Sequence, residues 1–248
     1  MASPSPINNH VSATSSKNNN NRLAPSSSGV ETFNKLMSNK VGIAAYKTGG
    51  EKGTFEGRIK RLNVDKQYTV HTGKAFINSL EKASIDKPIT KLIIGSHGSG
   101  SGIYMDSNAG LYGDTLDKYG NSLFYNFSFE LPSENARTLS DIKTKIESGD
   151  IRFAENAEIY ILGCKTANHT IAGIDGLAEE FSEIAPNTFV VGSTNRSNPD
   201  PMKSNPKLDS NNYYSRGSGG EWHVYHKGKK TQIIKNPLNP NKVTINKK

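Results

Sequence analysis

The chain has 248 residues, enough for one domain with tails or insertions, and a formal net charge of +8 at pH 7. The charge lies at the ends: residues 1–30 carry +2, residues 227–248 carry seven lysines and no acid, and residues 31–226 hold 22 basic and 23 acidic residues. A nearly neutral body argues against a nucleic-acid-binding fold, which needs a basic face. A single cysteine excludes an intrachain disulfide framework, and no apolar stretch reaches the roughly 18 residues of a membrane span.

The first 30 residues are rich in Ser, Asn and Pro and almost free of large apolar side chains. Such a segment cannot bury enough surface to order itself, so we expect a disordered tail at 1–30 and a folded domain at 31–235. The tail lacks an apolar core and is therefore not a secretory signal peptide. We expect a protein that is cytoplasmic in the cell that makes it.

Within the domain, short runs of β-forming residues alternate with segments of helical spacing. Strands are predicted at 41–47, 66–71, 91–97, 121–130, 157–163 and 188–193. Helices are predicted at 73–84, 139–148 and 174–186. Thr72 is the expected N-cap of the first helix, and Gly149 is the expected C-terminal signal of the second. Strand–helix–strand alternation predicts an α/β fold with a mainly parallel sheet covered by helices on both faces.

The segments between and after these elements also indicate local structure. The glycine-rich segment 98–114 predicts a small hairpin that overhangs the preceding strand, and 194–220 is a long polar loop with three prolines. Residues 221–236 alternate in polarity and predict a C-terminal hairpin that turns at Lys227–Lys229. A basic tail follows at 236–248, and a solvated tail is the ordinary interpretation of such a charge run.

Two apolar runs end in residues with reactive side chains. KLIIGSH leads to His97, and AEIYILG leads to Cys164, the only cysteine. Both runs have the composition of buried parallel strands, and open α/β sheets place ligands at the carboxyl ends of such strands. If the two strands are neighbours, the thiol and the imidazole meet at one edge, as a nucleophile and its base require. A lone cysteine at a strand end is more often a small buried residue.

The dipeptide His97–Gly98 suggests a second feature of a catalytic site, beyond the reactive side chains. Glycine allows a sharp turn and leaves its N–H unobstructed. The N–H groups of Gly98 and Cys164 are therefore candidates for an oxyanion hole, which stabilises a tetrahedral intermediate.

These residues carry a family resemblance. The segment IIGSHGSGSGIYMDS is similar to the caspase pattern of an apolar strand, Ser-His-Gly, a glycine-bearing turn and a hairpin, and AEIYILGC resembles the second strand with its nucleophilic cysteine. The order His-Gly then Cys is typical of the caspase-like (clan CD) cysteine peptidases. The ending Leu-Gly-Cys is nearest to bacterial caspase-like domains and toxin self-processing protease domains. The resemblance covers about residues 41–193, but its specific motifs are two short blocks.

The resemblance implies a three-layer caspase-like fold and a cysteine endopeptidase with His97 as general base, Cys164 as nucleophile and the Gly98 and Cys164 amides as oxyanion donors. It implies a protein or peptide substrate and no cofactor. Related enzymes carry a processing linker where this chain has 194–220, so self-cleavage there is a hypothesis. Toxin relatives are activated by an anionic phosphate ligand, which suggests Lys227, Lys229 and Lys230 as an anion site. The Ser-rich tail resembles that of exported bacterial effectors acting in a host cell.

The chain also departs from the caspase pattern. It has no Gln-Ala-Cys-Arg-Gly sequence, so aspartate specificity is not expected, and its interval from His97 to Cys164 is longer than in compact caspases. Asp106 and Asp114 lie in the predicted hairpin, from which they could approach a basic side chain of a substrate. Ordinary turn aspartates are the simpler interpretation. Two alternative functions stay open: a catalytically inactive caspase-like interaction module and a thiol acyltransferase.

The remaining motifs do not match any known phosphate-binding, dinucleotide-binding or metal-binding pattern. GSHGSG lacks the Gly-Lys-Ser/Thr of a P-loop and the third glycine of a dinucleotide fingerprint. Cys164 and the histidines show no paired metal-ligand spacing, so no metal site is expected. The residues whose chemistry would suit a zinc ligand are His97, His169, His223, His226 and Cys164.

Overall fold

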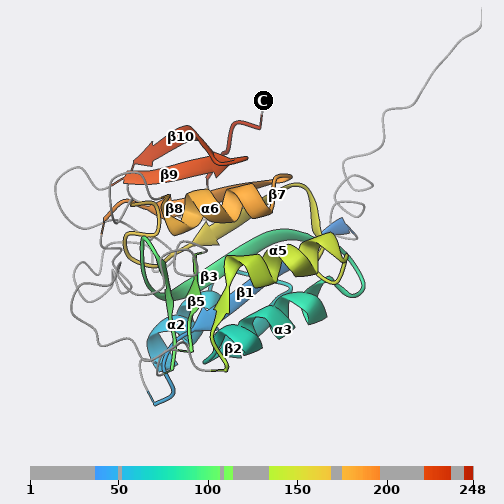
Figure 1. Ribbon diagram of the computed structural model, residues 1–248, viewed down its shortest axis with the longest axis vertical. Coiled ribbons are helices and arrows are strands. Elements are labelled where there is room, and N and C mark those ends of the chain that lie inside the picture. Colours follow the sequence, from blue (N-terminus) through green and yellow to red (C-terminus); the bar gives the residue numbers. More distant parts are fainter. Residues whose placement is uncertain are drawn as a thin grey trace, which may run out of the picture. The chain divides into compact units, whose positions relative to one another are not determined.

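The computed structural model describes residues 37–49, 52–106, 109–113, 134–168, 175–195, 221–235 and 243–247. These residues form an α/β fold around a mixed sheet of ten strands (Figure 1). The described strands are β1 Lys40–Ala45, β2 Lys66–Val70, β3 Ile89–Ser99, β4 Gly102–Tyr104, β5 Leu111–Tyr112, β6 Arg137–Thr138, β7 Phe153–Ile161, β8 Thr188–Ser193, β9 Glu221–His226 and β10 Lys229–Lys235. The described helices are α2 Lys52–Lys60, α3 Gly73–Ser84, α5 Leu139–Glu147 and α6 Leu177–Ile184.

The sheet combines parallel and antiparallel pairs. Strands β2, β1, β3, β7 and β8 pair in parallel in that order. The antiparallel hairpin β9–β10 extends the β8 side. The far end of β3 leaves the parallel body and pairs in antiparallel fashion with β4, and β4 pairs with β5. The expected hairpin after His97 and the expected C-terminal hairpin are therefore both present.

Most of the elements expected in the described residues lie where the sequence predicts them. Helix α3 begins after Thr72, whose side-chain oxygen accepts a hydrogen bond from the Ala75 amide at 3.1 Å, as an N-cap does. Helix α5 is followed by Gly149 at φ +80°, the left-handed conformation that glycine adopts at low cost. Helix α6 is shorter than the predicted 174–186. The strand expected at 121–130 and most of the loop 194–220 lie outside the described residues.

Helix α2 was not predicted from the sequence. It contains Gly53 and Gly57, which disfavour a helix, and four of its nine residues are charged. Its apolar residues Phe55 and Ile59, with Leu62 just beyond, are nevertheless spaced for one helical face, and each is at most 1% exposed. Packing against the sheet therefore stabilises a helix that local propensity does not favour.

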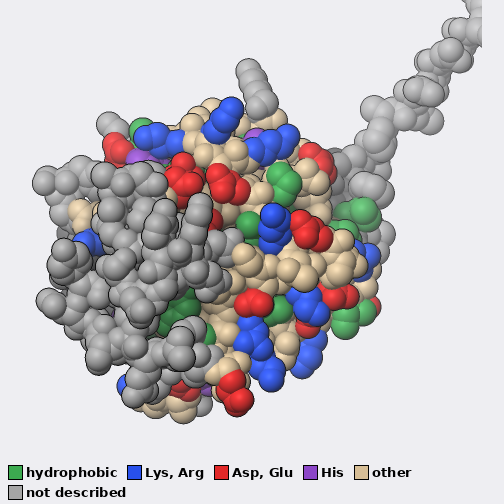
Figure 2. Space-filling view, viewed as in Figure 1, with side chains coloured by type: hydrophobic (Ala, Val, Ile, Leu, Met, Phe, Trp, Pro, Cys, Tyr) green, Lys and Arg blue, Asp and Glu red, His purple; other side chains and the backbone are tan. Residues whose placement is uncertain are grey.

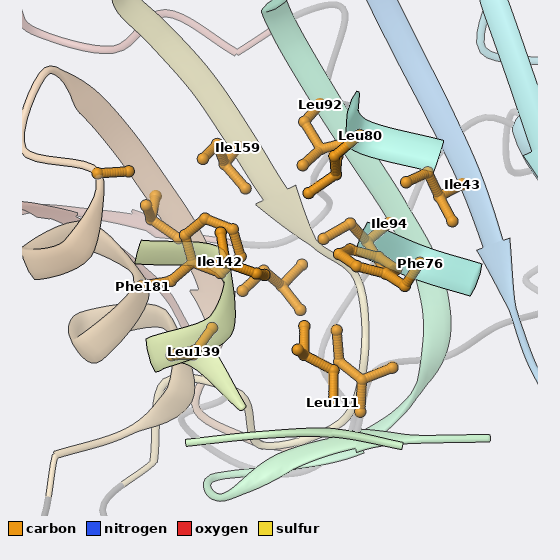
Figure 3. Close-up of a cluster of buried hydrophobic side chains, with 14 of the residues drawn as sticks. Ile43, Phe76, Leu80, Leu92, Ile94, Leu111, Leu139, Ile142, Ile159 and Phe181 are labelled. Carbon is orange, nitrogen blue, oxygen red and sulfur yellow. The ribbon is translucent and has the colours of Figure 1, made fainter. Parts of the chain in front are cut away.

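Apolar side chains alternate between the two faces of the sheet and form two core clusters. The first packs α3, α5 and α6 against one face, which is turned towards the viewer in Figure 1. Figure 3 draws part of it, including Ile43, Phe76, Leu92, Ile159 and Phe181. The second cluster packs α2 against the other face and includes Phe55, Ile59, Ile93, Tyr160 and Trp222. Because helices pack on both faces, β1 is buried from Val41 onward, β3 from Leu92 to Ser96 and β7 over its last three residues, Ile159–Ile161, as their apolar runs indicate.

Part of the segment expected as a solvated tail at 236–248 packs on the sheet. Ile245 is 6% exposed and belongs to the second core cluster. The Lys247 ammonium lies 2.8 Å from Glu158 on β7, and the Asn246 amide donates to the Gln232 side chain of β10 at 3.1 Å. A buried isoleucine among lysines is difficult to distinguish from a tail residue by composition, because the signal rests on one side chain.

Candidate functional site

The structure brings the two candidate reactive residues to one edge of the sheet. Strands β3 and β7 are parallel neighbours, with Ile94 paired to Ile161. The pairing continues past the end of β7, since the Leu162 amide donates to the Ile94 carbonyl at 2.9 Å. Three residues beyond the Ile94–Ile161 pair, the chain reaches His97 within β3 and Cys164 in the turn after β7. Neighbouring strands are about 4.8 Å apart, a spacing that suits a nucleophile and its base.

The segments next to these two residues leave no room for a side chain between them. A Cβ built on Gly98 would lie 3.6 Å from the Cys164 carbonyl oxygen and 3.1 Å from the Thr166 methyl carbon. A Cβ built on Gly163 would lie 3.3 Å from the Gly98 nitrogen. Glycine at these two positions lets the turn after β7 approach β3 closely. The amides of Gly98 and Cys164, the expected oxyanion donors, therefore belong to segments that touch.

The turn that carries Cys164 is anchored on the neighbouring strand β8. Lys165 has φ +54°, and its amide donates to the Asn195 carbonyl at 2.9 Å. The Ala167 amide donates to the Ser193 carbonyl at 2.9 Å. The buried Thr166 hydroxyl donates back to the Ile161 carbonyl at 3.2 Å. These bonds hold the half-buried Cys164 on a tight turn whose position is set by two strands.

His97 is exposed and has aromatic neighbours. Its ring packs against the buried ring of Phe55 from α2, with centroids 5.1 Å apart and an interplanar angle of 80°. Tyr104 on β4 is the cross-strand partner of His97, so both side chains lie on the same side of the hairpin. The Tyr104 hydroxyl donates to the Ser99 hydroxyl at 2.6 Å, which fixes the phenol beside the candidate base.

Further polar groups lie at the ends of β1 and β2. The His71 ring nitrogen Nδ1 donates to the Tyr46 carbonyl at 2.8 Å. The Asp106 carboxylate accepts hydrogen bonds from the amide and the hydroxyl of Thr48. Burial by itself raises the pKa of Asp106, but the Thr48 hydrogen bonds and the charges of His71 and Lys47 outweigh it and leave the pKa lowered. Asp106 is thus an ionised group that ties β4 to the end of β1, close to basic groups of its own chain. Asp114 lies outside the described residues.

The three candidate anion-binding lysines lie elsewhere. Lys227, Lys229 and Lys230 are exposed on the β9–β10 turn and the start of β10. Strand β9 runs antiparallel to β8, so its last residues lie at the sheet edge opposite to that of His97 and Cys164. The turn also packs close to an acid, because a Cβ on Gly228 would lie 2.5 Å from a Glu183 carboxylate oxygen. The structure does not bring these lysines to the candidate catalytic pair.

The histidines named as candidate metal ligands do not lie together in the described part of the chain. His223 lies 3.2 Å from Glu221 and His226 contacts the Thr188 carbonyl at 2.9 Å, on opposite faces of β9. His169 lies outside the described residues. Among the described residues, no group of three or more His, Cys, Asp or Glu side chains could hold a metal ion. None of the described helices is long and apolar enough to cross a membrane.

Sequence reasoning missed Phe55 as part of this site. Its helix was not predicted, and nothing near it in the chain marks it as a neighbour of His97. The only available signal was the apolar spacing of Phe55, Ile59 and Leu62, which identifies a buried face but not the residue against which it packs.

Comparisons of the chain with protein-family models, curated proteins and solved structures found no match.

Proposed function

We propose that the chain is a cysteine endopeptidase in which His97 and Cys164 act as a catalytic dyad. One observation carries the proposal: β3 and β7 are adjacent parallel strands, and His97 in the last part of β3 and Cys164 in the turn after β7 follow the same paired level, Ile94–Ile161. Adjacent carboxyl ends of parallel strands are where open α/β sheets perform chemistry. The resemblance of the two motifs to caspase-like peptidases, described above, supplies the reaction class.

In the proposed mechanism His97 takes the proton of the Cys164 thiol, and the thiolate attacks the carbonyl carbon of a peptide bond. The Gly98 and Cys164 amides donate hydrogen bonds to the oxyanion of the tetrahedral intermediate. The imidazolium of His97 then protonates the leaving amine, and an acyl-enzyme thioester remains. Water, deprotonated by His97, attacks the thioester and releases the carboxylic acid and the thiol.

The fold supports this class as well. The adjacent strands β2, β1, β3, β7 and β8 pair in parallel, helices pack on both faces of the sheet, and the β9–β10 hairpin follows. We propose that these elements form the three-layer, mainly parallel caspase-like arrangement. Self-processing within 194–220, activation by an anionic phosphate bound at Lys227, Lys229 and Lys230, and export into a host cell are further parts of the proposal. The remote position of the lysines means that such an activator would act without touching the dyad.

The test compares the wild type with Cys164→Ala and His97→Ala. We expect iodoacetamide to label Cys164 of the wild type at neutral pH, and more slowly in His97→Ala, because the base promotes thiolate formation. We expect the wild type to cleave members of a peptide library, with a loss of at least about 10³-fold in each variant. Phe76→Leu, in the core cluster on the other face of the sheet, serves as a control for general destabilisation.

The alternative functions give different results. An inactive interaction module would leave Cys164 unlabelled under conditions that label a control cysteine protease. A thiol acyltransferase would label at Cys164 but transfer an acyl group to an amine or thiol acceptor without net peptide hydrolysis. Either result would contradict the peptidase.

A further inference from the structure

The candidate base is held in an aromatic contact that its own strand does not provide. The imidazole of His97 lies on an exposed position of β3, where χ2 of a histidine is broad and several orientations compete. The ring of Phe55, from α2, meets it edge-to-face at a centroid distance of 5.1 Å. This contact joins segments 42 positions apart in the sequence, and it forms only when α2 packs on the sheet.

Phe55 is itself immobilised. It is 1% exposed and stacks on Tyr46, with centroids 6.1 Å apart and an interplanar angle of 20°. The Arg58 guanidinium lies 5.7 Å from its ring centroid. The Tyr46 hydroxyl donates to Glu56 at 2.7 Å, and burial together with this carboxylate raises the pKa of Tyr46 to about 12, which keeps the phenol a donor. The ring that His97 meets therefore has a fixed position.

We infer that Phe55 is a positioning residue that holds the His97 imidazole in the orientation from which it takes the Cys164 proton. The role rests on the proposed peptidase function, but the ring contact can be measured without it. A general base must hold its nitrogen within hydrogen-bond reach of the proton that it removes. An edge-to-face aromatic pair favours one ring orientation by about 2- to 13-fold.

Helix α2 carries this ring to the site although its own sequence disfavours a helix. The helix delivers Phe55 to the carboxyl edge of β1 and β3, next to Tyr46 and His97. A leucine at position 55 would keep the apolar burial and lose the ring. Phe55→Leu therefore separates orientation of the imidazole from packing of the helix.

The experiment measures the ring contact first. In the wild type with ¹³C-labelled histidine, assigned by comparison with His97→Gln, we expect a nuclear Overhauser effect between the His97 and Phe55 ring protons. In Phe55→Leu we expect the His97 ring protons to shift as the ring current is lost. We also expect kcat for a cleaved peptide to fall by about 2- to 13-fold with KM unchanged. The matched control Phe76→Leu removes a fully buried ring from the other core cluster and should leave both the His97 resonances and kcat unaltered.

The outcomes are distinct. The absence of a His97–Phe55 effect in the folded wild type would overturn the positioning role, even if Phe55→Leu fails to fold. Equal losses of kcat in Phe55→Leu and Phe76→Leu would also overturn it, because they would indicate general destabilisation. A wild type that neither labels at Cys164 nor cleaves peptides, yet whose His97 resonances depend on Phe55, would contradict the peptidase and support the ring contact.

Discussion

At the scale of single residues, Gly98 decides how closely β3 and the turn that carries Cys164 can approach each other. Gly98 touches the turn that carries Cys164, and a Cβ there would lie 3.1 Å from the Thr166 methyl carbon and 3.2 Å from the Gly102 carbonyl oxygen. The second neighbour is backbone and cannot rotate away. A side chain at position 98 would therefore move the amide proposed as an oxyanion donor.

We expect Gly98→Ala to lower kcat/KM by about tenfold to a hundredfold, since small displacements of catalytic groups have effects of this size. The control is Gly57→Ala in α2, where the nearest atom outside the helix backbone is the Arg61 guanidinium at 4.0 Å. That change should leave kcat/KM unaltered and raise the free energy of unfolding by about 0.5–1 kcal/mol. Steady-state kinetics and thermal unfolding measure the two effects. Unaltered kinetics in Gly98→Ala would argue that the Gly98 amide has no part in the reaction.

At the scale of elements, helices α3 and α2 show when local sequence predicts structure. Helix α3 has an apolar stripe and a side-chain cap at Thr72, and both signals agree with its environment. Helix α2 lacks a side-chain signal of this kind and contains two glycines, so only tertiary packing accounts for it. The strands β3 and β7 were predictable because continuous apolar runs have few alternatives inside a sheet.

The cap of α3 can be tested directly. We expect Thr72→Ala to lower the free energy of unfolding by about 1 kcal/mol, because the Ala75 amide loses its hydrogen-bond partner. The matched control is Thr144→Ala within α5, where the exposed hydroxyl only donates back to the Ser140 carbonyl. That change should be neutral or slightly stabilising. Urea denaturation measures both, and equal losses would contradict the cap.

At the scale of the whole molecule, residues 31–226 carry almost equal numbers of basic and acidic side chains. Figure 2 shows acidic and basic side chains interspersed over the described part of one face, in line with the near-neutral composition of 31–226. Two ion pairs meet at Glu158 on β7. Lys247 of the C-terminal segment lies 2.8 Å from this carboxylate, and Lys91 of β3 lies 3.0 Å from it. Burial by itself raises the pKa of Glu158, but the hydrogen bond from Lys247 and the charge and hydrogen bond of Lys91 outweigh it and leave the pKa lowered.

The lowered pKa of Glu158 determines how the stability of the fold changes with pH. The stabilisation by Glu158 is present above the unfolded pKa of about 4.3 and is lost as the pH falls through the lower folded pKa. We expect Lys247→Met to lower the free energy of unfolding at pH 7 by about 1 kcal/mol and to lessen its decline on acidification. The control Lys143→Met breaks an exposed pair with Glu147 and should change stability by less than about 0.5 kcal/mol. Unfolding measured from pH 7 to pH 3 tests both, and a variant with the wild-type pH profile would contradict the prediction.

The sequence by itself determined the α/β alternation, the apolar strands that end at His97 and Cys164, the cap at Thr72 and both hairpins, because each depends on residues adjacent in the chain. Only the tertiary structure decided that β3 and β7 are neighbours in register, that the sheet is mixed, that α2 forms, and that Ile245 is buried. Those outcomes depend on which surfaces meet across long separations, and periodicity carries no information about the partner. The same holds for the candidate site. The sequence predicted His97 and Cys164 from the apolar strands that lead to them, whereas the contact of Phe55 with His97 depends on the fold.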